Sequence, residues 1–463
     1  MTDHSRRDFL RRSAGLAGAA LIAPSLSGLV ACSRGTVPAT TAAFRRAGLG
    51  QGGYGPLRPA GADLALPEGF SYTVLSSTGK PMSDGNPTPC AFDGMAAFAL
   101  PNGNVRLIRN HENRDEPSTA KVKGDASKAY DPKGGGGTTS LEVRVDDDGS
   151  ATLVRDFLSL NGTIVNCAGG PTPWGSWLSC EESVDGRING WNEEHGYIFE
   201  VPATAEGPVA PVPLKAMGRF VHEAVAVDRA TGIVYETEDR TPTAGFYRFI
   251  PTERGRLAEG GRLQMLAVEG RPNYATGTGQ KVGVRLPVRW VDIGDPDPRE
   301  NGNNPTAIFD QGFVQGAARF ARLEGCWYGD ESIYFHATNG GDAEVGQVWR
   351  YQPASMERGT LVLVFESPSR EVLDYPDNIT VSPRGGIVIC EDGEGEQYLR
   401  GLTPEGAIFD LGRNLLNDTE FAGACFSPDG RALFVNIMGS TRDAGTDEGR
   451  TLAIRGSWGR GAL

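Results

Sequence analysis

A hairpin-like unit that occurs six times along the chain constrains its fold more than any other feature. Each copy has an apolar strand, a tight turn such as Pro-Asp-Gly, and a second apolar strand, which is the sequence pattern of a β-hairpin. The copies begin at Phe92, Asn166, His222, Leu323, Pro376 and Phe421. Self-similarity at intervals of several tens of residues is typical of propellers and solenoids. The six copies therefore predict six related modules.

Short strand-like segments between the copies supply enough further strands to complete four-stranded blades. Examples are residues 196–201, 245–249 and 347–351, and few stretches show helical periodicity. We therefore predict an all-β chain whose body, residues 66–463, is a single six-bladed β-propeller. The alternative is a sandwich of unrelated hairpins. The loop-rich residues from about 250 to 312 are expected to form an insertion that covers the channel mouth.

Residues 1–31 have the pattern of a twin-arginine export signal. Arg6-Arg7 precedes Phe9-Leu10 and a weakly apolar stretch that Gly and Pro interrupt, so a cleaved signal fits better than a membrane-spanning helix. Residues 29–32 resemble a lipobox, so that Cys32 is either a lipid anchor or an ordinary residue near the cleavage site. Residues 32–65 have the composition of a flexible tether. We expect a periplasmic or otherwise extracytoplasmic protein, free or lipid-anchored.

The charge and the cysteines exclude some classes of partner and site. The net charge of −13 makes nucleic acid an improbable ligand. The seven cysteines have no Cys-x-x-Cys spacing, so a structural zinc site is not indicated. An oxidising compartment permits disulfides, and the pairing stays open. The acidity is explained if many of the carboxylates hold cations.

Ligand-type residues recur at matching positions of the hairpins. The second residue of the first strand is, copy by copy, Asp93, Cys167, Glu223, Glu324, Asp377 and Ala422. Fifteen residues further on come Glu182, Glu238, Asn339 and Asp392, and Asn110-His111-Glu112 takes this place in the first copy. Equivalent positions of a propeller converge on its channel, where like charges about 4 Å apart repel by several kcal/mol. Bound cations would relieve that repulsion, whereas carboxylates at solvent-facing strand ends would need none.

The mixture of donors suggests more than one kind of cation. Carboxylates and amides suit hard cations such as calcium, whereas the thiolate of Cys167 suits iron or another transition metal. His111, His222 and His336 lie at the ends of the repeats, where they are either structural, orient the ligands or carry protons. The sequence thus predicts a metal site in the central channel.

Several motifs together resemble the PhoX family of alkaline phosphatases over nearly the whole mature chain. They are Asn166-Cys167-Ala168-Gly169-Gly170, Thr172-Pro173-Trp174-Gly175, Cys180-Glu181-Glu182, His222-Glu223-Ala224, Arg322-x-Glu324-Gly325 and Cys390-Glu391-Asp392. The resemblance implies a six-bladed propeller with an iron–calcium cluster. By this match Cys167 would bind iron, and Glu182, Glu223 and Glu324 would be ligands of the same cluster. The residues implied for calcium are Asp377, Asn378, Glu391, Asp392, Asn110 and Glu112.

The function that this resemblance implies is metal-dependent hydrolysis of small phosphate monoesters. Arg322 would hold the phosphate, and Arg240 is a second candidate for that role, since guanidinium groups bind phosphate in bidentate fashion. No Gly-x-Ser-x-Gly motif and no P-loop points to another mechanism. Two alternatives stay open: a calcium-dependent propeller of the lactonase type, and a non-catalytic propeller whose metals only join the blades. A disulfide between Cys167 and Cys180 would leave no thiolate for iron.

Overall fold

The computed structural model describes residues 45–299 and 304–463. The chain divides into two units, residues 1–45 and 46–463, and the second contains nearly all the described elements. The expected signal peptide and Cys32 lie outside the described residues. No helix within the described ranges is long and apolar enough to cross a membrane. A two-residue strand, β1 (Arg45–Arg46), lies at the boundary of the two units.

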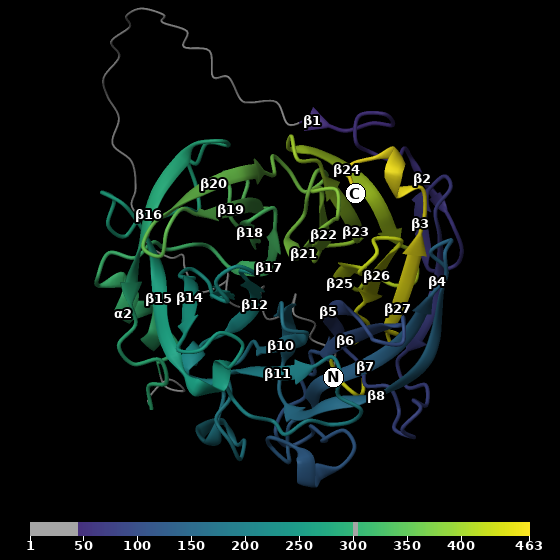
Figure 1. Cartoon of the computed structure of the whole chain (residues 1–463), viewed down its shortest axis with the longest axis horizontal. Coiled ribbons are helices and arrows are strands. Elements are labelled where there is room, and N and C mark those ends of the chain that lie inside the picture. The colour runs from purple at the N-terminus through teal and green to yellow at the C-terminus, as the bar shows by residue number, and fades with distance from the viewer. Residues whose placement is uncertain (1–44, 300–303) are drawn as a thin grey trace, which may run out of the picture. The chain divides into compact units, whose positions relative to one another are not determined.

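The six hairpins predicted from the sequence are all present, each formed by two antiparallel strands. The first strands are β5 (Phe92–Ala99), β9 (Asn166–Pro171), β12 (His222–Val227), β17 (Leu323–Gly329), β21 (Pro376–Val381) and β25 (Phe421–Phe426). The second strands are β6 (Val105–His111), β10 (Ser176–Glu181), β13 (Val234–Glu238), β18 (Ser332–Ala337), β22 (Ile387–Glu391) and β26 (Ala432–Ile437). Each first strand contacts the first strand of the next hairpin, and β25 contacts β5, so the series closes into a ring (Figure 1).

Further strands extend each hairpin outward into a blade. They are β7 (Gly136–Val145) and β8 (Ala151–Thr163), β11 (Ile198–Pro202), β14 (Phe246–Pro251) and β15 (Gly261–Val268), β19 (Gln347–Pro353) and β20 (Gly359–Glu366), β23 (Tyr398–Leu402) and β24 (Ala407–Asn414), and β27 (Arg450–Arg455). The last blade gains its fourth strand from β4 (Ser71–Ser77), which pairs with β27. The described residues thus form a six-bladed propeller, closed by pairing of an early strand with the last one, and the sandwich alternative is wrong.

The predicted tether is wrong for residues 46–65. Two strands within this segment, β2 (Leu57–Pro59) and β3 (Leu64–Pro67), extend the fifth blade, because β3 pairs with β24. Tyr54 is buried, and its ring packs edge-on against Phe70 and Trp458. The abundance of Gly and Pro in this stretch suggested flexibility, but its buried apolar residues hold it to the propeller.

The predicted insertion starts later than expected and lies elsewhere. Strands β14 and β15, which the range 250–312 includes in part or whole, are ordinary strands of the third blade. The added elements are β16 (Arg285–Asp292) and the short helix α2 (Ala307–Phe313). Strand β16 pairs with β15 on one side and β20 on the other, so it joins two blades into one nine-stranded sheet. Both elements therefore lie at the outer edge of the blades and do not cover the channel (Figure 1).

The remaining helical elements are single 3-10 turns in the loops. They are η1 (Ala126–Lys128), η2 (Arg187–Asn189), η3 (Lys215–Met217), η4 (Leu257–Glu259) and η5 (Trp458–Arg460).

Small residues on the inner strands allow the blades to converge. A β-carbon on Gly170 would lie 1.9 Å from the carbonyl oxygen of Val225 in the next blade, and one on Gly325 would lie 2.5 Å from the carbonyl oxygen of Asp377. Further from the axis, successive blades pack through apolar clusters. Phe246 and Phe335, for example, stack between the third and fourth blades at a centroid separation of 4.2 Å. The narrow centre is therefore left to the first few residues of each inner strand.

Candidate metal centre

One backbone hydrogen bond recurs in all six blades and defines the positions that face the channel. The residue after the second strand donates its N–H to the carbonyl of the residue before the first strand, at 2.9 to 3.2 Å. The pairs are Glu112–Ala91, Glu182–Val165, Asp239–Val221, Thr338–Arg322, Asp392–Tyr375 and Met438–Glu420. Each blade thus brings three positions to the channel: the residue before the first strand, the second residue of that strand, and the residue after the second strand.

The residue before the first strand is held in an unfavourable conformation in four of the blades. The φ angles are 56° for Ala91, 45° for Val165, 41° for Arg322 and 49° for Tyr375. Positive φ is costly for residues other than glycine, and most of all for a β-branched one such as Val165. Strain of this kind concentrates at functional sites, where the surrounding structure maintains it. Here it turns the chain sharply at the channel, just before the ligand-type residue.

These positions bring nine thiol and carboxylate groups together in four overlapping triads. Within each triad, one ligand atom from every residue lies within 4.8 Å of the others. The triads are Cys167–Glu182–Glu223, Glu223–Glu324–Asp377, Asp377–Asp392–Glu420 and Asp93–Glu112–Glu420. Successive triads share Glu223, Asp377 and Glu420, so they form one continuous arc, which we call the channel ring.

The channel ring fits a group of bound cations. Asp93, Glu223, Glu324 and Asp377 are at most 1% exposed, and buried carboxylates at such separations repel strongly unless positive charge lies among them. Oε2 of Glu112 is buried without a hydrogen-bond partner in the described part of the chain. Three of the triads offer only carboxylate oxygens, the donors that calcium prefers, and the fourth adds a thiol.

The sulfur of Cys167 lies at one end of the ring, close to two of the three glutamates that were expected around it. Its sulfur shares a triad with Glu182 and Glu223, whereas Glu324 belongs to the next triad. The six described cysteines are free, so there is no disulfide between Cys167 and Cys180. Burial, and then the carboxylates of Glu223 and Glu182, raise the pKa of the Cys167 thiol well above its ordinary value. A thiolate therefore requires a bound cation at this position.

Glu391 was predicted as a ligand, but it lies behind the ring. Successive residues of a strand point to opposite faces, so only Asp392 of this acidic pair belongs to a triad. Glu391 instead accepts hydrogen bonds from the backbone N–H of Asp374 at 3.0 Å and from Nε of Arg400 at 2.7 Å. Burial raises its pKa to about 7, although Arg400 opposes the shift. It joins the inner hairpin to the rest of its blade.

The same alternation places Glu181 and Glu238 behind the ring. Glu181 accepts from the backbone N–H groups of Ile164, Gly196 and Tyr197. Glu238 accepts from the N–H of Gly245 and the hydroxyl of Tyr247, both at 2.8 Å. In two blades the fifteen-residue spacing therefore misses the position equivalent to Glu182 by one residue. Asp239 occupies that position in place of Glu238, and Thr338 occupies it in place of Asn339.

The two predicted asparagine ligands hold backbone groups instead. Asn110 donates to the carbonyl oxygens of Cys167 and Ala168 at 3.0 and 2.7 Å. Its Oδ1 accepts from Trp177 Nε1 at 2.8 Å and from the Ser179 hydroxyl at 2.9 Å. The amide of Asn110 is fully used between the first two blades and leaves no oxygen for a cation.

Asn378 lies beside the ring. Its amide donates to Oδ1 of Asp377 at 2.9 Å, and its own oxygen accepts from the N–H of Gly423 at 2.6 Å. It therefore supports the orientation of Asp377.

The three histidines of the repeats bind backbone carbonyls around the ring. His111 Nδ1 lies 2.8 Å from the oxygen of Cys90, His222 Nε2 lies 3.0 Å from that of Gly218, and His336 Nδ1 lies 2.8 Å from that of Asp377. Burial lowers the pKa of His222 to about 3 and that of His336 to about 4. These neutral imidazoles hold strand ends in place.

The two arginines predicted to bind phosphate differ in their setting. Arg322 forms a two-pronged contact with Asp239, at 2.8 Å from Nε to Oδ1 and 2.7 Å from Nη2 to Oδ2, and its Nη2 also lies 2.7 Å from Glu324 Oε1. It is therefore fixed at the edge of the ring. Arg240 lies on the loop after β13, where its backbone oxygen accepts from the N–H of Arg322 at 3.4 Å. Nε of its guanidinium is buried without a hydrogen-bond partner in the described part of the chain.

Three residues of the site were missed by the sequence analysis. Asp239 orients Arg322, Glu420 joins two triads, and Arg114 contacts both Glu112 and Glu182 through Nη2. Each carried a signal. Asp239 follows Glu238 as Glu182 follows Glu181, and Glu420 stands in the position of Arg322 before its strand. Arg114 lies two residues after the Asn-His-Glu segment of the first repeat.

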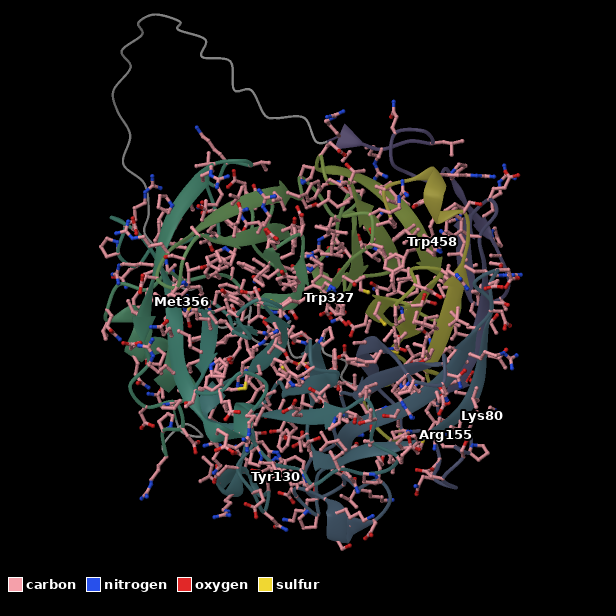
Figure 2. The ribbon with its side chains drawn as sticks, in the orientation of Figure 1. Lys80, Tyr130, Arg155, Trp327, Met356 and Trp458 are labelled. Carbon is pink, nitrogen blue, oxygen red and sulfur yellow. The ribbon has the colours of Figure 1, made fainter. Side chains whose placement is uncertain are left out.

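The channel is narrow beside the ring and widens toward the hairpin turns. A cavity of only about 10 Å³ lies between the inner strands, and a much wider one of about 1620 Å³ opens at the other end of the channel. Trp327 of β17 lines both cavities and lies near the middle of the ring of blades (Figure 2). It packs against three separate apolar clusters.

Comparison with known proteins agrees with this arrangement. PhoX of Pseudomonas fluorescens, in a structure with vanadate, described as a transition state analogue, is 17% identical, with a TM-score of 0.67 over 91% of this chain and 99% of that chain. A gluconolactonase of Xanthomonas campestris is 13% identical, with a TM-score of 0.39 over 86% and 99% of the two chains. No curated protein sequence matches significantly. The family model for alkaline phosphatase PhoX matches residues 52–440. This chain therefore belongs to the PhoX family of alkaline phosphatases.

Proposed function

We propose that this protein hydrolyses small phosphate monoesters at a mixed iron–calcium cluster held by the channel ring. The observation that carries the proposal is the composition of the four triads. Three of them are all-carboxylate, and the fourth includes the thiol of Cys167, with Arg322 fixed at the edge. Carboxylate-only sites suit calcium, and a site with one thiolate suits iron. The vanadate complex of the Pseudomonas fluorescens protein supports a phosphate-like substrate.

The ligands divide naturally between the two metals. Cys167, Glu182 and Glu223 would hold iron, and the other three triads would hold calcium. Such cations supply neutralisation of the phosphoryl charge and activation of the nucleophile near neutral pH. The shared residues Glu223, Asp377 and Glu420 would keep neighbouring cations close together, so that one phosphoryl group could contact several of them.

The protein's own groups bind and orient the phosphoryl group. The guanidinium of Arg322 is planar and always charged, which suits paired hydrogen bonds to phosphate oxygens. Asp239 holds it from behind, so little reorganisation is needed when charge develops on those oxygens. Trp327 lines both cavities of the channel, next to the inner strands that carry the ring.

Elemental analysis combined with a phosphatase assay on one sample tests this proposal. The protein should be folded with iron and calcium present, purified after export, and assayed with p-nitrophenyl phosphate. We expect bound iron and calcium, and loss of activity when a chelator removes the metals. A sample that contains calcium alone and cleaves a lactone would support the lactonase alternative instead. A fully metal-loaded sample that cleaves neither ester would support a purely structural role for the metals.

We also propose export through the twin-arginine pathway. The twin arginine and the apolar stretch in residues 1–31 support this route, which carries folded proteins and so suits a metal centre loaded beforehand. Fractionation of cells that produce the wild type and an Arg6→Lys, Arg7→Lys variant tests it. The wild type should be outside the cytoplasm and the variant should remain inside. Mass spectrometry of the mature N-terminus would show whether Cys32 carries lipid.

A further inference from the structure

Arg114 occupies the one gap in the channel ring. The four triads are linked in series by Glu223, Asp377 and Glu420, but the two ends of the series share no residue. One end carries Glu182 of the second blade, and the other carries Glu112 of the first. Nη2 of Arg114 contacts both of these carboxylates, so the guanidinium completes the circle with a fixed positive charge.

The local structure holds the backbone of Arg114, and the side chain is partly exposed. Its N–H donates to the carbonyl of Thr441 at 2.8 Å, and Asn113 beside it donates to Asp443 and Asp115 at 3.2 and 3.1 Å. The loop is therefore tied to the last blade. The side chain of Arg114 is 24% exposed, whereas those of Glu112 and Glu182 are 0% and 6% exposed. The side chain of Arg114 is therefore more accessible to solvent than the two carboxylates that it bridges.

Arg114 and Arg322 lie on opposite sides of the channel. Arg114 follows the inner hairpin of the first blade and Arg322 precedes that of the fourth, and these blades face each other in a ring of six. Each arginine bridges two carboxylates at the ring edge. A phosphoryl group above the ring therefore meets one guanidinium from either side, and a group with three terminal oxygens can contact both of them and the ring together.

We propose that Arg114 is a second phosphate-binding guanidinium that makes the site selective for monoesters over diesters. The inference rests on the phosphatase function proposed above. A monoester is a dianion with three terminal oxygens, so it can bind Arg114, Arg322 and the ring cations together. A diester has two terminal oxygens and a single charge, and its second ester group must occupy the place of one of these contacts. Arg114, the more exposed arginine, is where that group meets the protein.

Two ester substrates distinguish this role. Wild type, Arg114→Ala and Arg114→Lys would be assayed with p-nitrophenyl phosphate and bis(p-nitrophenyl) phosphate. Inorganic phosphate binding would be measured by calorimetry, and metal content by elemental analysis. Arg114→Ala should lower kcat/KM for the monoester and the affinity for phosphate by about 10- to 100-fold, as expected for loss of one charged hydrogen bond. The diester rate should change less than about threefold, and Arg114→Lys should recover part of the phosphate affinity.

A matched control and the metal analysis keep the outcomes separate. Arg442→Ala removes a partly exposed arginine that contacts Glu116 at 3.7 Å, outside the ring. It should leave the phosphate affinity and the monoester-to-diester ratio of kcat/KM unchanged. Metal content should be equal or higher in Arg114→Ala, because a competing cation is removed from the ring. Unchanged phosphate affinity, an unchanged monoester-to-diester ratio, or loss of metal from Arg114→Ala would each overturn the proposal. If the metal-loaded wild type neither binds phosphate nor cleaves the monoester, the proposed function itself fails.

Discussion

Replacing Asn110 with alanine separates a structural role from the ligand role that the sequence suggested. The change removes the acceptor of the Trp177 indole N–H and of the Ser179 hydroxyl, together with the donors to two carbonyl oxygens. All of these groups are buried. Leaving one buried polar group without its partner costs about 1–3 kcal/mol. With the indole as the largest contribution, we expect Asn110→Ala to lower the free energy of unfolding by about 3–5 kcal/mol.

Chemical denaturation of the metal-free protein measures this loss, and elemental analysis of the metal-loaded variant provides the second readout. Metal content should match that of the wild type, since hydrogen bonds within the protein occupy both the oxygen and the nitrogen of the Asn110 amide. Asn110→Asp is the sharper companion, because it keeps an oxygen but loses both N–H donors. It should destabilise the protein as well. Unchanged stability of the metal-free variants with a fall in metal content would show that Asn110 is a ligand and that this reading of the site is wrong.

Two further predictions concern Arg322 at the edge of the ring and His195, a buried histidine that contacts Glu181. Arg322→Ala should lower kcat for a phosphate monoester by about 10²- to 10³-fold with metal content unchanged, and full activity would remove Arg322 from the site. Burial opposes the charge on His195, but Glu181 and then Asp131 outweigh it and raise the pKa to about 9. The stabilisation is complete below about pH 6.5, the ordinary pKa, and is lost as pH rises through 9. It amounts to about 3 kcal/mol, so the difference in melting temperature between wild type and His195→Gln should narrow as the pH rises from 6.5 to 10, and a constant difference would exclude this coupling.

The hairpin repeat made the architecture predictable, because turn chemistry and strand alternation are local properties. The inner strands begin at the six residues that the pattern marked. The ends of the chain were harder to interpret. Composition suggested a tether for residues 32–65, but Leu64 is buried in the fifth blade, and most residues of its apolar cluster lie more than 300 residues away in the sequence.

The site was predictable at the positions that recur from repeat to repeat, and less so elsewhere. Asp377 and Asp392 belong to the ring, whereas Glu391 was misassigned because adjacent strand residues point to opposite sides. Asn110 was misassigned because its partners, Trp177 and Ser179, come from another blade. Such contacts depend on how the blades pack, and no pattern within one repeat reveals them.

Visible absorption of metal-loaded wild type and Cys167→Ser is the most direct test of the central claim that a thiol in the ring binds iron. Charge transfer from a thiolate to ferric iron would give the wild type a visible band, and a serine oxygen cannot reproduce it. We predict a coloured wild type that contains iron, and a Cys167→Ser protein that is folded, has lost the band and hydrolyses no phosphate monoester. A colourless wild type without iron, or a variant with the same band and activity, would contradict the account.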